Sequence, residues 1–110
     1  MSREMIANRL RFLVYGDNAW RLTVQMDSAG IPTIVFDAHG MRAKDAKKAL
    51  EDIVRILYSV PISLKVIHGY RRGTAIKDML SEETFNDRLI SKQSPVRNPG
   101  VTIMQLRNAA

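Results

Sequence analysis

Apolar residues fall into several short runs along the chain. Residues 20–26 alternate between apolar and polar side chains, and residues 33–37 have the apolar run of a buried strand, so two strands are predicted that the turn residues 27–30 can join as a hairpin. Short apolar runs bounded by turn residues predict three further strands, at 62–67, 89–92 and 101–106. The pattern therefore predicts five strands.

A second pattern, with apolar residues three and four apart, predicts helices. It is clearest at 43–58, where Ala46, Leu50 and Ile53 belong to one apolar stripe and charged residues occupy the remaining positions. Pro61 ends this helix. Two shorter helices are predicted, one near residues 5–14 and one that begins at Thr74.

The order of these elements predicts an α/β fold, a two-layer sandwich with a mixed sheet and a βαβαββ core. The strand–helix–strand unit at 33–67 makes its two strands parallel and favours their being neighbours. At 110 residues the chain is expected to form one domain. Residues 1–18 are expected to be a basic arm or a short helix, and residues 19–110 the domain itself.

Composition narrows the class of protein. The chain has no cysteine, which excludes disulfides, a thiol nucleophile and thiolate metal sites, and fits a cytoplasmic location. No apolar run approaches the roughly 20 residues of a membrane span, and no signal peptide is evident. No membrane partner is therefore expected.

Charge points toward a class of partner. Seventeen lysines and arginines against eleven acidic residues give a net charge of +6. A basic domain attracts phosphate polymers by releasing their counterions, so DNA or RNA is the predicted partner. The competing interpretation is that the charge only keeps a small protein soluble.

The two histidines of the chain both follow predicted strands, in Asp37-Ala38-His39-Gly40 and in His68-Gly69. Because ligands bind at the carboxyl ends of parallel strands, both histidines and Asp37 are expected at one edge of the sheet. Residues two apart on an extended chain share a face, so Asp37 and His39 can meet. A carboxylate beside an imidazole favours the protonated ring and suits general acid–base catalysis.

The second corner predicts an anion site. Gly69 and Gly73 let a backbone approach a ligand closely, Arg71 and Arg72 can pair with phosphate oxygens, and Thr74 opens a helix whose free N–H groups favour anions. The predicted nucleic-acid-binding residues are therefore Gly69, Arg71, Arg72, Gly73, Thr74 and Lys77.

Simpler interpretations compete with each of these sites. His68 could donate to a backbone carbonyl, Asp37 could cap the following helix, and Arg71-Arg72 could be a solvated corner. Asp37 and the two histidines could resemble a two-histidine, one-carboxylate metal site, but no fourth ligand is evident and no metal ligands are assigned. A divalent ion, Mg²⁺ or Mn²⁺, is left open as a cofactor.

At these residues the chain resembles the Smr (small MutS-related) domain family. The matching segments are Phe36-Asp37-Ala38-His39-Gly40, Val66-Ile67-His68-Gly69 with the glycine-bearing turn after it, and Gly100-Val101-Thr102-Ile103. The resemblance covers about residues 33–106. It implies a fold like the C-terminal domain of translation initiation factor 3, nucleic-acid binding and, in several members, DNA nicking or RNA cleavage.

The resemblance also implies roles for individual residues. The family's Asp-x-His motif, associated with catalysis, maps to Asp37 and His39, and its second motif maps to His68 and Gly69. Ala38 replaces the usual leucine, Arg42 stands where a threonine commonly caps the helix, and the glycine-rich stretch before the last strand is reduced to Asn98-Pro99-Gly100.

The combined expectation is a nucleic-acid-binding domain with endonuclease activity. Asp37 and His39 would act as a general base or position the nucleophile, and His68 would act as a general acid or stabilise developing charge. The alternative is a non-catalytic DNA- or RNA-binding module. A third, weaker alternative is a domain for a small phosphate ligand or a protein partner. The sequence does not distinguish between DNA and RNA as the partner, and it leaves the oligomeric state open.

Overall fold

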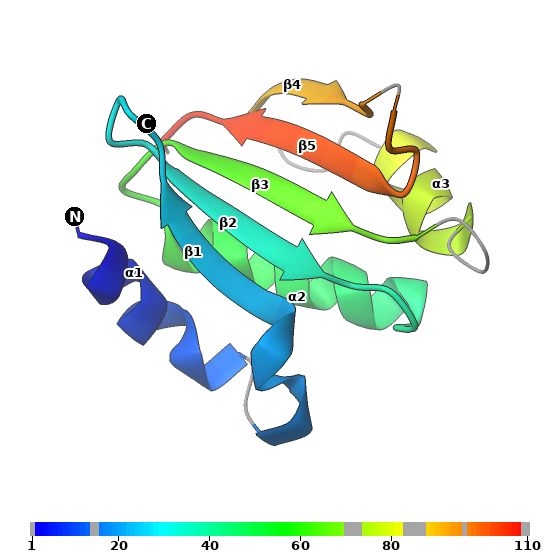
Figure 1. Cartoon of the computed structure of the whole chain (residues 1–110), viewed down its shortest axis with the longest axis horizontal. Coiled ribbons are helices and arrows are strands. Elements are labelled where there is room, and N and C mark those ends of the chain that lie inside the picture. The colour runs from blue at the N-terminus through cyan, green and yellow to red at the C-terminus, as the bar shows by residue number, and fades with distance from the viewer. Residues whose placement is uncertain (1, 14–15, 70–73, 83–87, 96, 109–110) are drawn as a thin grey trace.

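The computed structural model describes residues 2–13, 16–69, 74–82, 88–95 and 97–108 (Figure 1). Five strands and three α-helices follow one another along the chain, with two short 3₁₀ turns, Arg11–Leu13 and Gly16–Arg21, before the first strand. In chain order the elements are α1 (Arg3–Leu10), β1 (Leu22–Met26), β2 (Pro32–Asp37), α2 (Ala43–Ile56), β3 (Ile62–Ile67), α3 (Thr74–Glu82), β4 (Leu89–Gln93) and β5 (Val101–Leu106).

The strands form one mixed sheet in the order β1-β2-β3-β5-β4. β2 and β3 pair in parallel, while β1–β2, β3–β5 and β4–β5 pair antiparallel. α2 runs along one face of the sheet and connects the two parallel strands (Figure 1). The α/β class, the hairpin of β1 and β2, and the pairing of β2 with β3 as parallel neighbours are thus confirmed.

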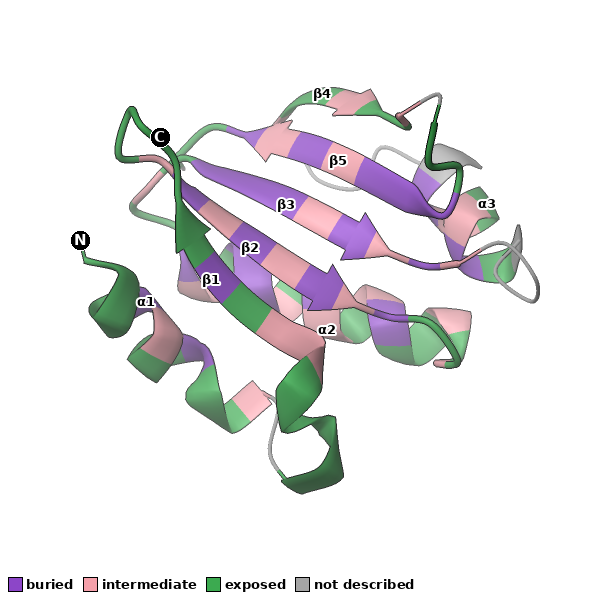
Figure 2. Ribbon diagram, in the orientation of Figure 1, coloured by how far each residue is buried: buried purple, intermediate pink, exposed green. Residues whose placement is uncertain are grey.

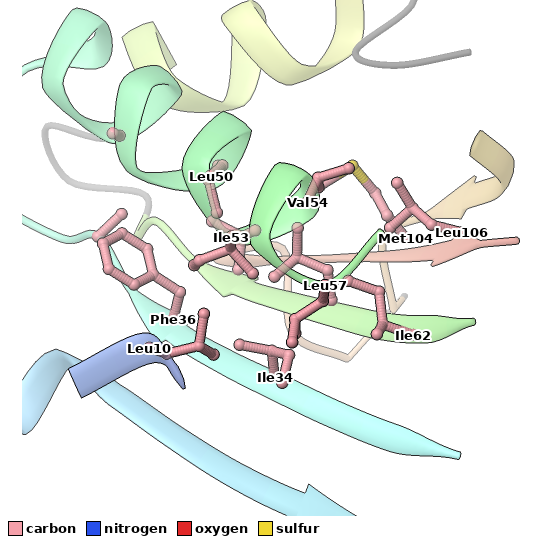
Figure 3. Packing of buried hydrophobic residues seen from close by; sticks show 14 of the residues in the cluster. Leu10, Ile34, Phe36, Leu50, Ile53, Val54, Leu57, Ile62, Met104 and Leu106 are labelled. Atoms are coloured by element: carbon pink, nitrogen blue, oxygen red, sulfur yellow. The ribbon is translucent and has the colours of Figure 1, made fainter. Parts of the chain in front are cut away.

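The alternation in the strands places one set of side chains against the helices. Ile34 and Phe36 of β2 and Leu64 of β3 are almost fully buried, and they pack in the same cluster as Leu50 and Ile53 of α2. Figure 3 shows Ile34 and Phe36 facing Leu50 and Ile53 in the space between the sheet and α2. Burial of such a cluster is the main driving force for this fold.

The N-terminal segment belongs to the same core. Ser2 caps α1 by accepting a hydrogen bond from the backbone N–H of Met5 (3.2 Å). Ile6 and Leu10 on one face of α1 are fully buried, and the remaining face is largely exposed (Figure 2). Residues 3–10 are therefore a packed helix and not a loose arm.

The first strand begins later than the sequence pattern predicts. Residues 20–26 alternate, but Trp20 and Arg21 lie in the 3₁₀ turn Gly16–Arg21, and β1 starts at Leu22. Trp20, which shares its place in the alternation with Leu22 and the buried Val24, is 54% exposed. The Arg21 side chain explains the difference, because it donates to backbone carbonyls beyond the end of the strand pairing and holds the chain out of the ladder.

A buried arginine joins the end of α2 to the end of β5. Arg88 donates to the carbonyls of Val54 (2.5 Å), Leu57 (3.1 Å), Val60 (2.9 Å) and Arg107 (2.6 Å). Carbonyls at a helix C-terminus have no partner within the helix, and a cation there is favourable. Arg88 therefore closes the end of the fold opposite the carboxyl ends of β2 and β3. Among the described residues, no helix has the length and apolarity needed to cross a bilayer.

Candidate functional site

Asp37 and His39 form a close pair where β2 ends. Oδ1 of Asp37 lies 2.5 Å from Nδ1 of His39 and accepts the backbone N–H of His39 at 3.1 Å. The turn that follows needs Gly40 at a positive φ of 81°. α2 is capped by Arg42 without a side-chain hydrogen bond, so Asp37 is not its cap.

The pair presents the imidazole to solvent. The His39 side chain is 60% exposed, whereas that of Asp37 is 23% exposed. An ionised carboxylate only accepts hydrogen bonds, so the tautomer of His39 that pairs with an ionised Asp37 is the one with the proton on Nδ1. Nε2 is then the nitrogen that can exchange a proton with a ligand. This is the tautomer and orientation that a general base requires.

His68 lies at the same end of the sheet but points into the protein. It is 1% exposed. Nδ1 is 2.9 Å from the carbonyl oxygen of Gly69, and Nε2 is 2.9 Å from Oγ1 of Thr102 on β5. Of the two interpretations left open by the sequence, this geometry matches the contact with a backbone carbonyl, because neither ring nitrogen faces solvent.

The two His-Gly corners do meet, through backbone. The N–H of Ala38 donates to the carbonyl of Ile67 (2.7 Å), which extends the parallel pairing past β2. Gly69 has a φ of +73°, and a Cβ atom there would lie 3.8 Å from Cβ of His39. The N–H groups of His68 and Gly69 both donate to the carbonyl of Gly100 (2.8 and 3.0 Å). His39 is therefore next to Gly69, while the two imidazoles have separate environments.

Trp20 and Arg21 complete the surface around His39, and the sequence analysis did not assign them to the site. The ring centroids of Trp20 and His39 are 5.5 Å apart with an interplanar angle of 51°. The guanidinium carbon of Arg21 lies 4.5 Å from the centre of the Trp20 ring. Nη1 of Arg21 donates to the carbonyls of Asp37 (3.0 Å) and His39 (2.9 Å).

The hairpin register explains this meeting. Leu22 pairs with Phe36 in the antiparallel β1–β2 ladder, so the residues before Leu22 come beside those after Phe36. Arg21 and Trp20 leave the ladder in the 3₁₀ turn, so the alternation over 20–26 indicated only that they lie near the end of β2 and not which side chains they contact.

The anion-binding half of the predicted site is described only at its ends. Arg71, Arg72 and Gly73 lie outside the described residues. α3 begins at Thr74, as predicted, and Lys77 on α3 is half-buried. Among the described residues, no three acidic or histidine side chains are grouped to hold a metal ion.

Comparisons of the chain with models of protein families, with curated proteins and with solved structures found no match.

Proposed function

We propose that this protein is a nucleic-acid-binding domain, similar to Smr domains, that cleaves phosphodiester bonds at the Asp37–His39 pair. The observation that carries the proposal is the 2.5 Å contact between Asp37 Oδ1 and His39 Nδ1 on an imidazole that is 60% exposed. A carboxylate that orients a solvent-facing imidazole is a common arrangement for proton transfer. The net charge of +6 favours a polyanionic substrate.

The chemistry assigned to the pair is general base catalysis. Nε2 of His39 takes a proton from the attacking nucleophile, which is a water molecule or, in RNA, the ribose 2′-OH group. The attacking oxygen bonds to phosphorus as the bond from phosphorus to the leaving oxygen breaks, and the leaving oxygen takes a proton from solvent or from the histidine. Asp37 holds the ring and stabilises the imidazolium that forms. Because Gly69 has no side chain, a nucleic-acid strand can approach His39 closely.

His68 has no proton-transfer role in this proposal. Its burial and its two hydrogen bonds support a structural role, in which it links the β3 corner to Thr102 on β5. The general acid expected of it from the sequence is accordingly not part of the mechanism.

The test is an incubation of the protein with labelled single-stranded RNA, DNA duplex and supercoiled plasmid, each with Mg²⁺, Mn²⁺ or EDTA. We expect cleavage of at least one substrate by the wild type and its loss in His39→Ala and Asp37→Ala. Wild-type rates in both variants would refute this mechanism. The metal arms show whether a divalent ion adds to the chemistry of the pair.

The buried position of His68 favours a second candidate, a binding module without cleavage, because one exposed histidine is the only imidazole on the described surface. That reading predicts salt-sensitive binding without cleavage on every substrate. The logarithm of the binding constant should then fall linearly with the logarithm of the salt concentration. Cleavage that depends on His39 would exclude it.

A further inference from the structure

We propose that Trp20 is a stacking platform for an unpaired nucleobase, so that the site takes single-stranded segments of nucleic acid in preference to duplex. This inference rests on the proposed function and adds to it a class of substrate. It begins from an exposed aromatic residue: Trp20 is the only tryptophan of the chain and is 54% exposed.

The position of Trp20 connects it with the reacting group. Its ring centroid is 5.5 Å from that of His39, so one nucleotide can touch both rings. A base stacked on the indole would hold its backbone beside Nε2 of His39. Other large apolar residues are exposed elsewhere, but among the exposed large apolar residues that the structure describes, Trp20 is the one with a ring contact to His39.

The indole is also held in place before any ligand arrives. Arg21 lies over the ring, and its guanidinium is fixed by Oδ1 of Asn18 (3.0 Å) and by the carbonyls of Asp37 and His39. An arginine over an indole face is an attractive cation–π contact. Trp20 stays 54% exposed with Arg21 over its ring and His39 beside it. A ring fixed in this way loses little rotamer entropy on binding.

Stacking on such a ring discriminates between single and double strands. In a duplex each base is already stacked and its faces are hidden, whereas an unpaired base can be turned out onto an aromatic side chain. Base–aromatic stacking tolerates any sequence, because every base has a π face. The platform therefore predicts a preference for unpaired regions without a strong preference for sequence.

The experiment uses the full chain and intrinsic fluorescence. Because the chain has one tryptophan, indole emission reports on Trp20 alone. We would titrate a strand of about 12 nucleotides, within the range bound by single-strand-binding folds, and the same strand as a duplex, and check on gels that both stay intact. We expect quenching by the single strand and little change with the duplex.

Variants separate stacking from folding. Trp20→Ala should weaken single-strand binding about tenfold, which corresponds to about 1.4 kcal/mol, and leave duplex binding and thermal unfolding nearly unchanged. Trp20→Phe should restore most of the affinity. The control is Tyr58→Ala, which removes another exposed aromatic ring, beyond the C-terminal end of α2, and should bind as the wild type does.

The outcomes distinguish the two proposals. One outcome is that a labelled strand binds or is cut without any change in the emission of Trp20, and that Trp20→Ala binds that strand with the affinity of the wild type. In that case the stacking platform is wrong and the proposed function stands. Equal quenching by single strand and duplex would also overturn the inference. If no nucleic acid is bound or cut, both proposals fail.

Discussion

Oδ1 of Asp37 lies 2.5 Å from Nδ1 of His39 and 3.1 Å from its backbone nitrogen, so one carboxylate oxygen fixes both the ring and the turn. The local cause is a strand that ends at Asp37 and a corner that Gly40 completes at positive φ. The neighbouring parallel strand brings Gly69 against His39. The orientation of the His39 ring is therefore set by contacts from both strands.

The first prediction concerns the two members of this pair. His39→Ala should lower the single-turnover cleavage rate by about 100-fold or more, because general acid–base groups contribute on that scale. Asp37→Asn should lower the rate less, by about tenfold, since the amide can still accept from the ring but carries no charge to stabilise the imidazolium.

Stability measurements serve as the control for this pair. His39 is exposed, so its truncation should change the free energy of unfolding by less than about 0.5 kcal/mol. A larger fall in stability would mean that lost activity reflects misfolding and would count against a chemical role.

His68 should behave in the opposite way. His68→Ala should lower the free energy of unfolding by about 2–4 kcal/mol, because it opens a cavity and leaves the Thr102 hydroxyl and the Gly69 carbonyl without their partner. The measurement is urea unfolding, combined with cleavage rates per folded molecule in the wild type and the variant. A variant that folds normally but does not cleave would contradict the structural role.

Arg88 should be among the most sensitive polar positions of the chain. Arg88→Ala removes the donor from four backbone carbonyls and should cost about 3 kcal/mol or more. Arg88→Lys should recover only part of this loss, since an ammonium cannot reproduce the planar fork. Arg42→Ala is the matched control, because Arg42 is exposed and makes no side-chain cap, and its effect should stay within about 0.5 kcal/mol. Similar losses for the two alanine variants would show that Arg88 does not hold the end of α2.

Asp52 on α2 predicts a pH dependence of stability. The hydrogen bond from Arg55 (3.0 Å), with that from Lys48 (3.3 Å), holds the pKa of Asp52 below its usual value, although partial burial opposes this shift. A lowered folded-state pKa contributes stability above the unfolded pKa of about 3.9, and that stability is lost as the pH falls through the folded value.

The test compares Asp52→Asn with the wild type from pH 7 down to pH 2. The variant should be less stable at pH 7 by about 0.3–1 kcal/mol, the scale of two helical pairs, and the difference should vanish at the acid end. A constant difference across this range would show that the carboxylate does not act through its charge.

Much of the fold was readable in the sequence because burial imposes a period on each element. The apolar run at 33–37 and the 3–4 spacing at 43–58 identified β2 and α2, although α2 ends at Ile56, before the end that Pro61 predicted. The alternation failed at Trp20, where the hydrogen bonds of Arg21 to carbonyls of a different segment override the local pattern.

The order of residues alone places these chemical groups directly after the strands, and the crossover through α2 brings the ends of β2 and β3 to one edge of the sheet. The direction in which each side chain faces, and the groups that it contacts, depend on the assembled sheet. His39 is exposed to solvent and contacts Asp37. His68 is buried, as the alternate residues of β3 before it are, and it contacts Thr102 of β5, which lies 34 residues away in sequence. A local pattern sets the period of a strand, but a contact between distant segments depends on sheet order and register, which no single segment contains.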